Sequence, residues 1–430
     1  MRSTVLQTLG AISAILLLAV TATAEDWPHW RGPNRDDVTS DRSGWSSDGW
    51  IKSPPAWTKN VDEGSSSPIV VGDRLFAIGW KANKDHVVCL QASTGKEIWS
   101  VSYNCPRYGR QATGDQGLYG GPTSTPEYDP ATGYLYTLSC DGDLNCWDAG
   151  EKGRQVWSLN LYDIYKVEQR PRIGRSGRRD YGYTTAPLVH GDWLIVEIGA
   201  QAGTLAAFDK RTGKQIWLSE AKGFAGHAGG LAPIEVEGVP SVAAFTFQGL
   251  LVTRLDPGHA GETVAEYEWM TSFANSIATP AVFDNYILIT SEYNRNAICK
   301  LEIRLTGAKK IWEQPLASKI CSPIVHAGHV YWCWQRLYCL DFETGVKVWE
   351  GGDFGDAGSC ILTGDDRLIL WGGRGTLALT ETAQRSPGSF RELAKVENVF
   401  SEDVWPHVVL ANGQIFCKGK SGDLKCFRVP

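Results

Sequence analysis

The five residues Gly95-Lys96-Glu97-Ile98-Trp99 form a phrase that recurs along the chain and decides its fold. A glycine is followed by a basic residue, an aliphatic residue and a tryptophan, and the copies end at Trp99, Trp157, Trp217, Trp312 and Trp349. The glycine suits the positive φ of a tight turn before a strand. The tryptophan can reach across to a neighbouring repeat and bury a large apolar area. Such a recurring unit predicts a repeat architecture.

A second phrase, a small residue and a proline before a short apolar run, marks the start of a unit. Its closest copies are Ser67-Pro68-Ile69-Val70, Ala186-Pro187-Leu188-Val189, Thr279-Pro280-Ala281-Val282 and Ser322-Pro323-Ile324-Val325. Between the two phrases, short runs rich in Val, Ile, Tyr and Trp alternate with turn signals such as Gly72-Asp73. No long amphipathic helix pattern interrupts them. Each unit is therefore expected to form four antiparallel strands.

Counting these units predicts how the chain closes into a ring. The last unit, residues 402–429, holds only three strand-like runs, whereas the run around Trp57 is a fourth strand without its own three. Joining the two gives eight complete units. We predict an all-β fold, an eight-bladed β-propeller of four-stranded antiparallel blades in which an N-terminal strand completes the C-terminal blade. Closure of this kind removes exposed sheet edges.

Composition excludes several classes of protein. The chain has 430 residues, with 18 Trp, 2 Met and a net charge of −6. With 43% hydrophobic residues it is too apolar for a disordered protein, and with 21% charged residues it is too polar for a polytopic membrane protein. Its glycine and proline contents are too low for a collagen-like protein. Binding to nucleic acid needs a concentrated basic surface, so the acidic balance argues against a nucleic-acid partner.

The first 24 residues have the pattern of a secretory signal peptide. Arg2 precedes an apolar run from Leu9 to Val20, and Thr21-Ala22-Thr23-Ala24 offers the small residues of a cleavage site. We expect residues 1–24 to be removed, residues 25–53 to pack as a leader on the propeller, and residues 54–430 to form it. The mature chain is then periplasmic or secreted and has no transmembrane span. An uncleaved membrane anchor is the alternative.

The two phrases resemble the PQQ-type repeat of quinoprotein-dehydrogenase-like β-propellers over residues 50–430. Within that superfamily, the non-catalytic group that includes BamB-like proteins is the nearer likeness. The leader Asp26-Trp27-Pro28-His29-Trp30-Arg31-Gly32-Pro33-Asn34-Arg35 resembles the opening of exported PQQ-like repeat proteins of planctomycete-type bacteria. The resemblance implies the fold strongly and the function weakly, because one fold hosts many functions.

The stretches before the first strand of each blade are expected to surround the mouth of the central channel. They carry polar side chains of several kinds: Tyr183, His227, Asn275, Lys319, Asp356 and His407. Polar groups that converge between aromatic walls are typical of a ligand site. The alternative is that they only hydrate the channel and cap strand ends.

An insertion after Trp157 is basic. It contains Lys166, Arg170, Arg172, Arg175, Arg178 and Arg179. Such a segment, projecting from the mouth face, could bind an anionic ligand or an acidic partner. A solvated loop without a partner is the alternative.

The eleven cysteines follow the repeat in part. Cys89, Cys146, Cys299, Cys339 and Cys426 fall in third strands, where a small apolar residue is expected. If Ser421-Gly422 forms a two-residue turn, Cys417 and Cys426 stand opposite each other and could form a disulfide. No CxxC occurs, and His326-x-x-His329 has no further Cys, His or carboxylate at metal-ligand spacing, so we predict a turn there and no metal site.

Three functions remain open at this point. The first is an exported, non-catalytic scaffold, a monomer that binds a protein or an extended polymer at the channel mouth and needs no cofactor. The second is a PQQ- and Ca²⁺-dependent alcohol or sugar dehydrogenase. Glu197 and Glu292-Tyr293-Asn294 could supply oxygen ligands, but the sequence lacks a Cys-Cys dipeptide and a haem motif, and no residue can be assigned as the catalytic base. The third is a hydrolase or lyase with an unfamiliar arrangement of mouth residues.

Overall fold

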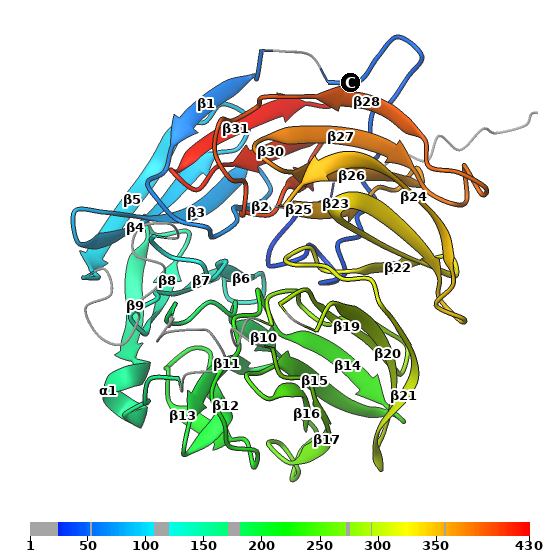
Figure 1. The fold of residues 1–430 in the computed structure, drawn as a ribbon. Coiled ribbons are helices and arrows are strands. Elements are labelled where there is room, and N and C mark those ends of the chain that lie inside the picture. Colours follow the sequence, from blue (N-terminus) through cyan, green and yellow to red (C-terminus); the bar gives the residue numbers. More distant parts are fainter. Residues whose placement is uncertain are drawn as a thin grey trace, which may run out of the picture.

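The computed structural model describes residues 25–51, 54–106, 120–170, 181–271, 276–293, 295–356 and 358–430. In these residues eight separate antiparallel sheets follow one another around a ring. The first strand of each sheet lies nearest the centre of the ring, and the later strands lie progressively outward (Figure 1). The predicted eight-bladed β-propeller is confirmed.

The first four blades are each built from four consecutive strands. Blade 1 contains β2 (Ile69–Val71), β3 (Arg74–Lys81), β4 (Lys84–Gln91) and β5 (Glu97–Asn104). Blade 2 contains β6 (Glu127–Asp129), β7 (Tyr134–Leu138), β8 (Asp143–Asp148) and β9 (Arg154–Asn160), and the short helix α1 (Leu161–Tyr165) follows it. Blade 3 contains β10 (Leu188–His190), β11 (Trp193–Ala200), β12 (Gly203–Asp209) and β13 (Gln215–Leu218). Blade 4 contains β14 (Ala232–Val236), β15 (Val239–Phe245), β16 (Gly249–Arg254) and β17 (Thr263–Glu268).

The remaining blades vary this plan. Blade 5 contains β18 (Ala281–Phe283), β19 (Tyr286–Ser291), β20 (Ala297–Arg304) and β21 (Gly307–Gln314). Blade 6 contains β22 (Ile324–His326), β23 (His329–Asp341) and β24 (Lys347–Gly355). Blade 7 contains β25 (Gly358–Leu362), β26 (Arg367–Gly372), β27 (Thr376–Glu381) and β28 (Glu392–Val396). Blade 8 contains β29 (Val409–Ala411), β30 (Gln414–Lys418), β31 (Asp423–Arg428) and β1 (Trp57–Asn60).

Blade 6 keeps the four-stranded form although two of its strands are continuous. Strand β23 turns at Gln335, whose φ is 60°. The rings of Trp332 and Tyr338, on the two sides of this turn, stack with centroids 5.0 Å apart. The first half of β23 pairs with β22 and the second half with β24. Strand β23 therefore supplies both the second and the third strand of the blade.

The ring closes where the sequence predicted. Strand β1 pairs antiparallel with β31, with Trp57 opposite Cys426 and Asn60 opposite Asp423. The C-terminal blade thus takes its outermost strand from the N-terminal part of the chain.

The predicted pairing of Cys417 with Cys426 is wrong by one residue. Cys417 lies opposite Lys425, and Cys426 lies opposite Phe416. The connection between β30 and β31 is one residue longer than a two-residue turn, because Gly419 pairs with Asp423 and Gly422 takes a φ of 96°. A slip of one residue places the two thiols on opposite faces of the sheet, so they cannot bridge.

The outer rim of the ring is held by the recurring phrase. Four tryptophans of fourth strands reach the next blade, as expected, and pack on its turn glycine. The pairs are Trp57 on Gly95, Trp99 on Gly153, Trp157 on Gly213 and Trp312 on Gly345. A Cβ added at Gly153 would lie 2.7 Å from the Trp99 ring. The indole of Trp99 also donates to the carbonyl of Ala149 at 3.2 Å, so blades are joined by apolar contact and a hydrogen bond together.

No helix among the described residues has the length and apolar character needed to cross a membrane.

Candidate functional site

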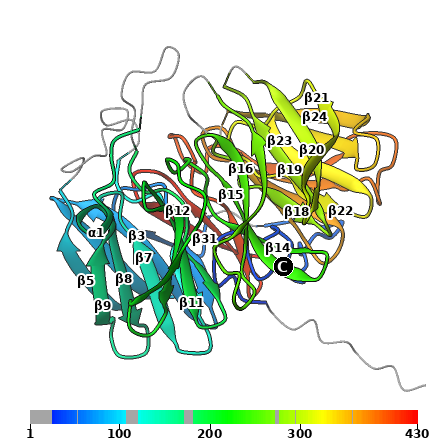
Figure 2. The same ribbon diagram turned by 90° about the horizontal axis from the view of Figure 1, so that it is seen from below.

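The first part of the leader, defined here as residues 25–51, lies in the central channel. Trp27 exchanges two backbone hydrogen bonds with Val70 of β2, each 2.8 Å long. In blade 7, two places away around the ring, Val38 bridges Leu362 of β25. The dark blue trace of the leader accordingly lies inside the ring of blades in both views (Figures 1 and 2). The channel is therefore occupied by the chain itself.

A buried ion pair fixes the middle of the leader. Arg31 and Asp37 are 1% and 0% exposed, and Arg31 Nε lies 2.5 Å from Asp37 Oδ2. Arg31 Nη2 also donates to the carbonyl of Pro323, just before β22, at 2.7 Å. On the other side, Asp37 Oδ1 lies 3.1 Å from His407 Nε2, just before β29. The leader is thereby tied to blades 6 and 8.

The charge state of Asp37 follows from these partners. Burial alone raises the pKa of its carboxyl group, but Arg31 and His407 outweigh that effect and hold the pKa below its ordinary value. Asp37 is therefore ionised at neutral pH, and the leader carries a buried charge that needs both partners.

A second polar cluster holds the leader to blades 2 and 3. Arg35 forms an ion pair with Glu127 of β6, and Glu127 Oε1 also accepts the backbone N–H of Val189 in β10 at 3.0 Å. Burial raises the pKa of Glu127, and Arg35 opposes this shift. His29 lies beside Glu127, but burial and Arg35 lower its pKa to about 3. The imidazole is therefore neutral, and its contact with Glu127 is not an ion pair.

Trp30 lies at the mouth of the channel. Its indole donates to Thr279 Oγ1 at 2.9 Å and meets the His407 ring edge-on, with centroids 5.4 Å apart. Gly229 and Gly230 lie against the same indole so closely that a Cβ at either position would collide with it. A side chain of the leader thus reaches the segments that precede the first strands of blades 4, 5 and 8.

The structure divides the six predicted mouth residues instead of bringing them together. His407 binds the leader. Tyr183 is 3% exposed and donates from Oη to the carbonyl of Ile198 at 2.9 Å. His227 is 5% exposed, with Nε2 2.9 Å from Arg170 Nη1. Asn275 lies outside the described residues. Three of the six therefore have partners inside the protein, and a convergent funnel site stays a prediction.

The basic insertion is described only in part. Arg172, Arg175, Arg178 and Arg179 lie outside the described residues. Lys166 ends α1 in a left-handed conformation with φ 52°. Arg170 is 9% exposed and donates to the carbonyls of Ala225 at 2.6 Å and Gly226 at 3.1 Å. Arg170 anchors the insertion to blade 4, so it does not belong to an external anion-binding surface.

Lys319 and Asp356 do meet, in an exposed group that we call the rim cluster: Tyr293, Lys319, Trp334 and Asp356. Lys319 Nζ lies 2.5 Å from Asp356 Oδ2 and 5.7 Å from the centre of the Tyr293 ring. The indole of Trp334 donates to Asp356 Oδ1 at 2.8 Å. The side chain of Asp356 is 53% exposed. Blades 5, 6 and 7 thus each present aromatic or charged groups at one place.

The sequence pointed to only half of this cluster. Trp334 lies in the turn of β23, and Tyr293 lies between β19 and β20. In an antiparallel blade the connection after the second strand returns to the face where the first strand began. Turns after second strands therefore belong to the mouth face as much as the stretches before first strands do.

One of the carboxylates considered as an oxygen ligand for a Ca²⁺-bound quinone already has partners inside the protein. Glu197, the carboxylate considered as an oxygen ligand, is 1% exposed and both of its oxygens are engaged. Oε2 accepts from Thr185 Oγ1 at 2.5 Å and Oε1 from the N–H of Gly226 at 2.9 Å. Within the described ranges, no three His, Cys, Asp or Glu side chains form a group that could hold a metal ion.

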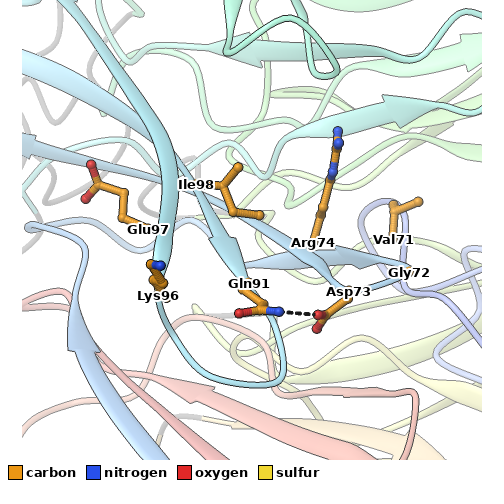
Figure 3. A pocket seen from close by; sticks show the side chains of 8 residues that line it. All are labelled: Val71, Gly72, Asp73, Arg74, Gln91, Lys96, Glu97 and Ile98. Atoms are coloured by element: carbon orange, nitrogen blue, oxygen red, sulfur yellow. Dashed lines mark hydrogen bonds between the residues drawn. The ribbon is translucent and has the colours of Figure 1, made fainter.

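A cavity of about 620 Å³ is a different feature (Figure 3). It lies where β2 ends and β5 begins, at the opposite end of blade 1 from the mouth. Asp73 accepts a hydrogen bond from Gln91 Nε2 at 2.9 Å there, and Arg74 and Glu97 complete a polar lining. These side chains stabilise turns, and the cavity brings no set of reactive groups together.

Comparisons with known proteins place the chain in a family. The family model described as "Outer membrane protein assembly factor BamB" matches residues 111–351, more than half of the chain. The chain belongs to this family. The crystal structure of BamB from Moraxella catarrhalis covers 87% of the chain and is itself covered to 97%, with a TM-score of 0.58 and 14% identity. At this identity the likeness shows the fold alone.

Dehydrogenases also resemble this BamB-family chain. Quinohemoprotein alcohol dehydrogenase from Comamonas testosteroni covers 95% of it and is covered to 81%, with a TM-score of 0.67 and 14% identity. The dehydrogenase subunit of alcohol dehydrogenase (quinone) from Gluconobacter oxydans (strain 621H) is 30% identical over 169 residues, which are 38% of this chain and 20% of that protein. The chain thus spans about a fifth of the length of that relative.

Proposed function

We propose that this protein is an exported, non-catalytic scaffold that binds a partner protein on the mouth face through the rim cluster. The observation that carries the proposal is the leader in the channel. Trp30 lies at the mouth, and Arg31, Asp37 and His407 use their polar atoms on one another. A ligand that approaches this face therefore meets a channel that the leader occupies, with side chains at its rim.

The chemistry of the rim cluster suits a protein partner. Aromatic side chains and paired charges are the groups that dominate binding energy at protein interfaces. The ion pair of Lys319 with Asp356 is partly exposed, and such pairs contribute only about 0–1 kcal/mol to stability. Its members can therefore exchange partners at small cost.

Family membership supports the same class of function. The matching family is described as an outer membrane protein assembly factor. The N-terminal pattern of residues 1–24 adds the expectation that the chain is exported. We therefore propose a role in the cell envelope, in which the propeller holds a partner and catalyses no reaction.

A matched pair of variants tests the binding surface. Lys319→Glu combined with Trp334→Ala should lower the capture of envelope proteins by about tenfold or more, which corresponds to ~1.4 kcal/mol of binding energy. Lys347→Glu is the control, because Lys347 forms a comparable exposed pair with Glu350 in the same blade, away from the mouth. The readout is the amount of each partner that is crosslinked and identified by mass spectrometry. Equal capture by both variants would contradict the proposed surface.

The second candidate, a quinone-dependent dehydrogenase, has one specific observation in its favour. The 30% identity to a quinone-dependent alcohol dehydrogenase subunit extends over 169 residues. Purified protein is mixed with PQQ and Ca²⁺, and bound-cofactor absorbance and dye reduction by alcohols are measured. We expect neither, because Glu197 is already engaged and Trp30 lies at the mouth. Cofactor uptake with dye reduction would replace the scaffold proposal.

A further inference from the structure

Two groups stand out among the eleven buried cysteines. Five occupy the third strand of five different blades: Cys89, Cys146, Cys299, Cys339 and Cys426. Four of these five stand directly opposite a rim tryptophan, in the pairs Cys89–Trp99, Cys146–Trp157, Cys339–Trp349 and Cys426–Trp57. In blade 3 the same position is Ala207, opposite Trp217. A small side chain is therefore what this position requires, and these cysteines are packing residues.

Cys321 and Cys360 do not follow that rule. Cys321 precedes β22 of blade 6, and Cys360 lies within β25 of blade 7. Their exposed fractions are 2% and 0%, and their Sγ atoms lie 3.6 Å apart. The backbone N–H of Cys333 points at Cys321 Sγ from 3.4 Å and helps to fix its position. Two thiols from neighbouring blades are thus held in contact, and neither occupies the third-strand position at which the repeat requires a small side chain.

We propose that Cys321 and Cys360 form a disulfide that joins blade 6 to blade 7 in the exported protein. The two sulfur atoms must approach by about 1.5 Å to reach the ordinary S–S length of about 2.05 Å. Side-chain rotation about the Cα–Cβ bonds can supply a movement of this size. In contrast to Cys417 and Cys426, these two thiols already face each other.

The chemistry is thiol–disulfide exchange with a protein or small-molecule disulfide as oxidant. One thiolate attacks the oxidant's disulfide and releases one thiol, and the second thiolate then displaces the other. Two protein thiols lose two protons and two electrons, and the oxidant becomes two thiols. An oxidising compartment supplies such oxidants, and the proposal depends on export only in this respect.

Burial determines when the bond forms. The contact with Cys321, together with burial, raises the pKa of the Cys360 thiol, and the thiolate is the reactive form. The folded, reduced pair is therefore unreactive, and the exchange belongs to the folding of blades 6 and 7, before the thiols are enclosed.

The position of the bond gives it a consequence for the leader. Two residues after Cys321, the carbonyl of Pro323 accepts Arg31. Two residues after Cys360, Leu362 pairs with Val38. A covalent link between these two segments fixes the wall of the channel that grips the leader, so the oxidised protein should hold the leader more firmly than the reduced one.

Peptide mapping tests the bond directly. The full chain is folded with oxidised glutathione, denatured with an alkylating agent present, and digested without reductant. We expect one peptide pair that joins Cys321 to Cys360 and disappears on reduction, with Cys333 alkylated. Separate alkylation of Cys321 and Cys360, or a bond from either to Cys333, would overturn the proposal.

Melting of matched variants gives a second measurement. Both are made with Cys140→Ser, because the Cys105 thiol contacts that of Cys140 and could respond to reductant as well. In this background, dithiothreitol present during folding should lower the Tm of the Cys299→Ser control by several degrees and speed the cleavage of the leader by protease. Cys360→Ser should show neither change. An equal response of the two variants would also overturn the proposal.

Discussion

The outer rim and the central channel of this propeller are stabilised in opposite ways. At the rim the same contact repeats from blade to blade, as where Trp99 packs on Gly153 and donates to a carbonyl of the next blade. In the channel a single segment occurs once and is held by buried charges, chiefly Arg31 and Asp37. The stabilisation at the rim is therefore spread over several similar contacts. In the channel it comes from a few charged groups, and each of them is stable in the interior only while its partner is present.

Removal of one rim tryptophan should have the largest effect. Trp99→Ala deletes a buried ring and should lower the free energy of unfolding by about 3–5 kcal/mol. The control is Ile98→Ala, because Ile98 is 47% exposed and its loss should cost within about 0.5 kcal/mol. Urea unfolding followed by tryptophan fluorescence measures both. Similar losses in the two variants would show that the rim contact is not what joins the blades.

Asp37→Ala should act on the channel alone. Truncation leaves Arg31 buried without its carboxylate, a change that costs about 3–5 kcal/mol where no relaxation is possible. Release of the leader from the channel costs less free energy than keeping Arg31 buried without a partner. The loss of global stability should therefore be smaller for Asp37→Ala than for Trp99→Ala. We expect rapid proteolysis of residues 25–51 from an otherwise intact ring. Asp48→Ala, at an exposed position of the leader, should leave the protection unchanged; equal cleavage of both would refute the role of the ion pair.

Acid should loosen the leader in a way that depends on Asp37. A carboxyl group whose pKa is lowered by folding stabilises the folded state above its unfolded pKa of about 3.9, and this contribution disappears as pH falls through the lower folded value. The hydrogen-exchange protection factors of the leader amides, which correct for the intrinsic pH dependence of exchange, should therefore fall below about pH 4. The pKa of Glu127 is raised in the folded protein, so protonation of this carboxyl group favours the folded state. Glu127 therefore does not cause the loss of stability in acid. An unchanged acid response in Asp37→Asn would assign the effect to other groups.

Lys319→Ala should have the smallest effect on stability. The side chain is 22% exposed and its ion pair with Asp356 lies at the surface, so the expected change is about 0–1 kcal/mol. Differential scanning calorimetry should find the Tm close to that of the unmodified protein even though partner capture falls. A large fall in Tm would place Lys319 among the structural contacts of the ring.

The sequence predicts the rim well because the rim repeats. The glycine and the tryptophan of the recurring phrase each have one structural task, and the copies confirm one another. The leader has no copies, so nothing in the pattern of Trp30, Arg31 or Asp37 indicates that these side chains enter the channel. Chain position placed Tyr183 and His227 near the mouth. It could not show that the side chain of Tyr183 would hydrogen-bond to Ile198 and that of His227 to Arg170 in the interior.

Small differences in turn length account for the remaining error. The position of Cys417 relative to Cys426 depends on whether the turn has two residues or three, and one residue reverses the face. Trp334 was missed because the turn of β23 is so tight that the strand continues through it. Both cases depend on local backbone geometry that residue types alone leave open.

The pairing of β1 with β31 has a consequence for how the molecule is made. Strand β1 leaves the ribosome long before its partner β31. Ring closure therefore waits until β31 is made, and until then β1 presents an unpaired edge that could bind other chains. The nascent chain needs shielding over this whole interval, because no smaller part of the propeller closes into the ring.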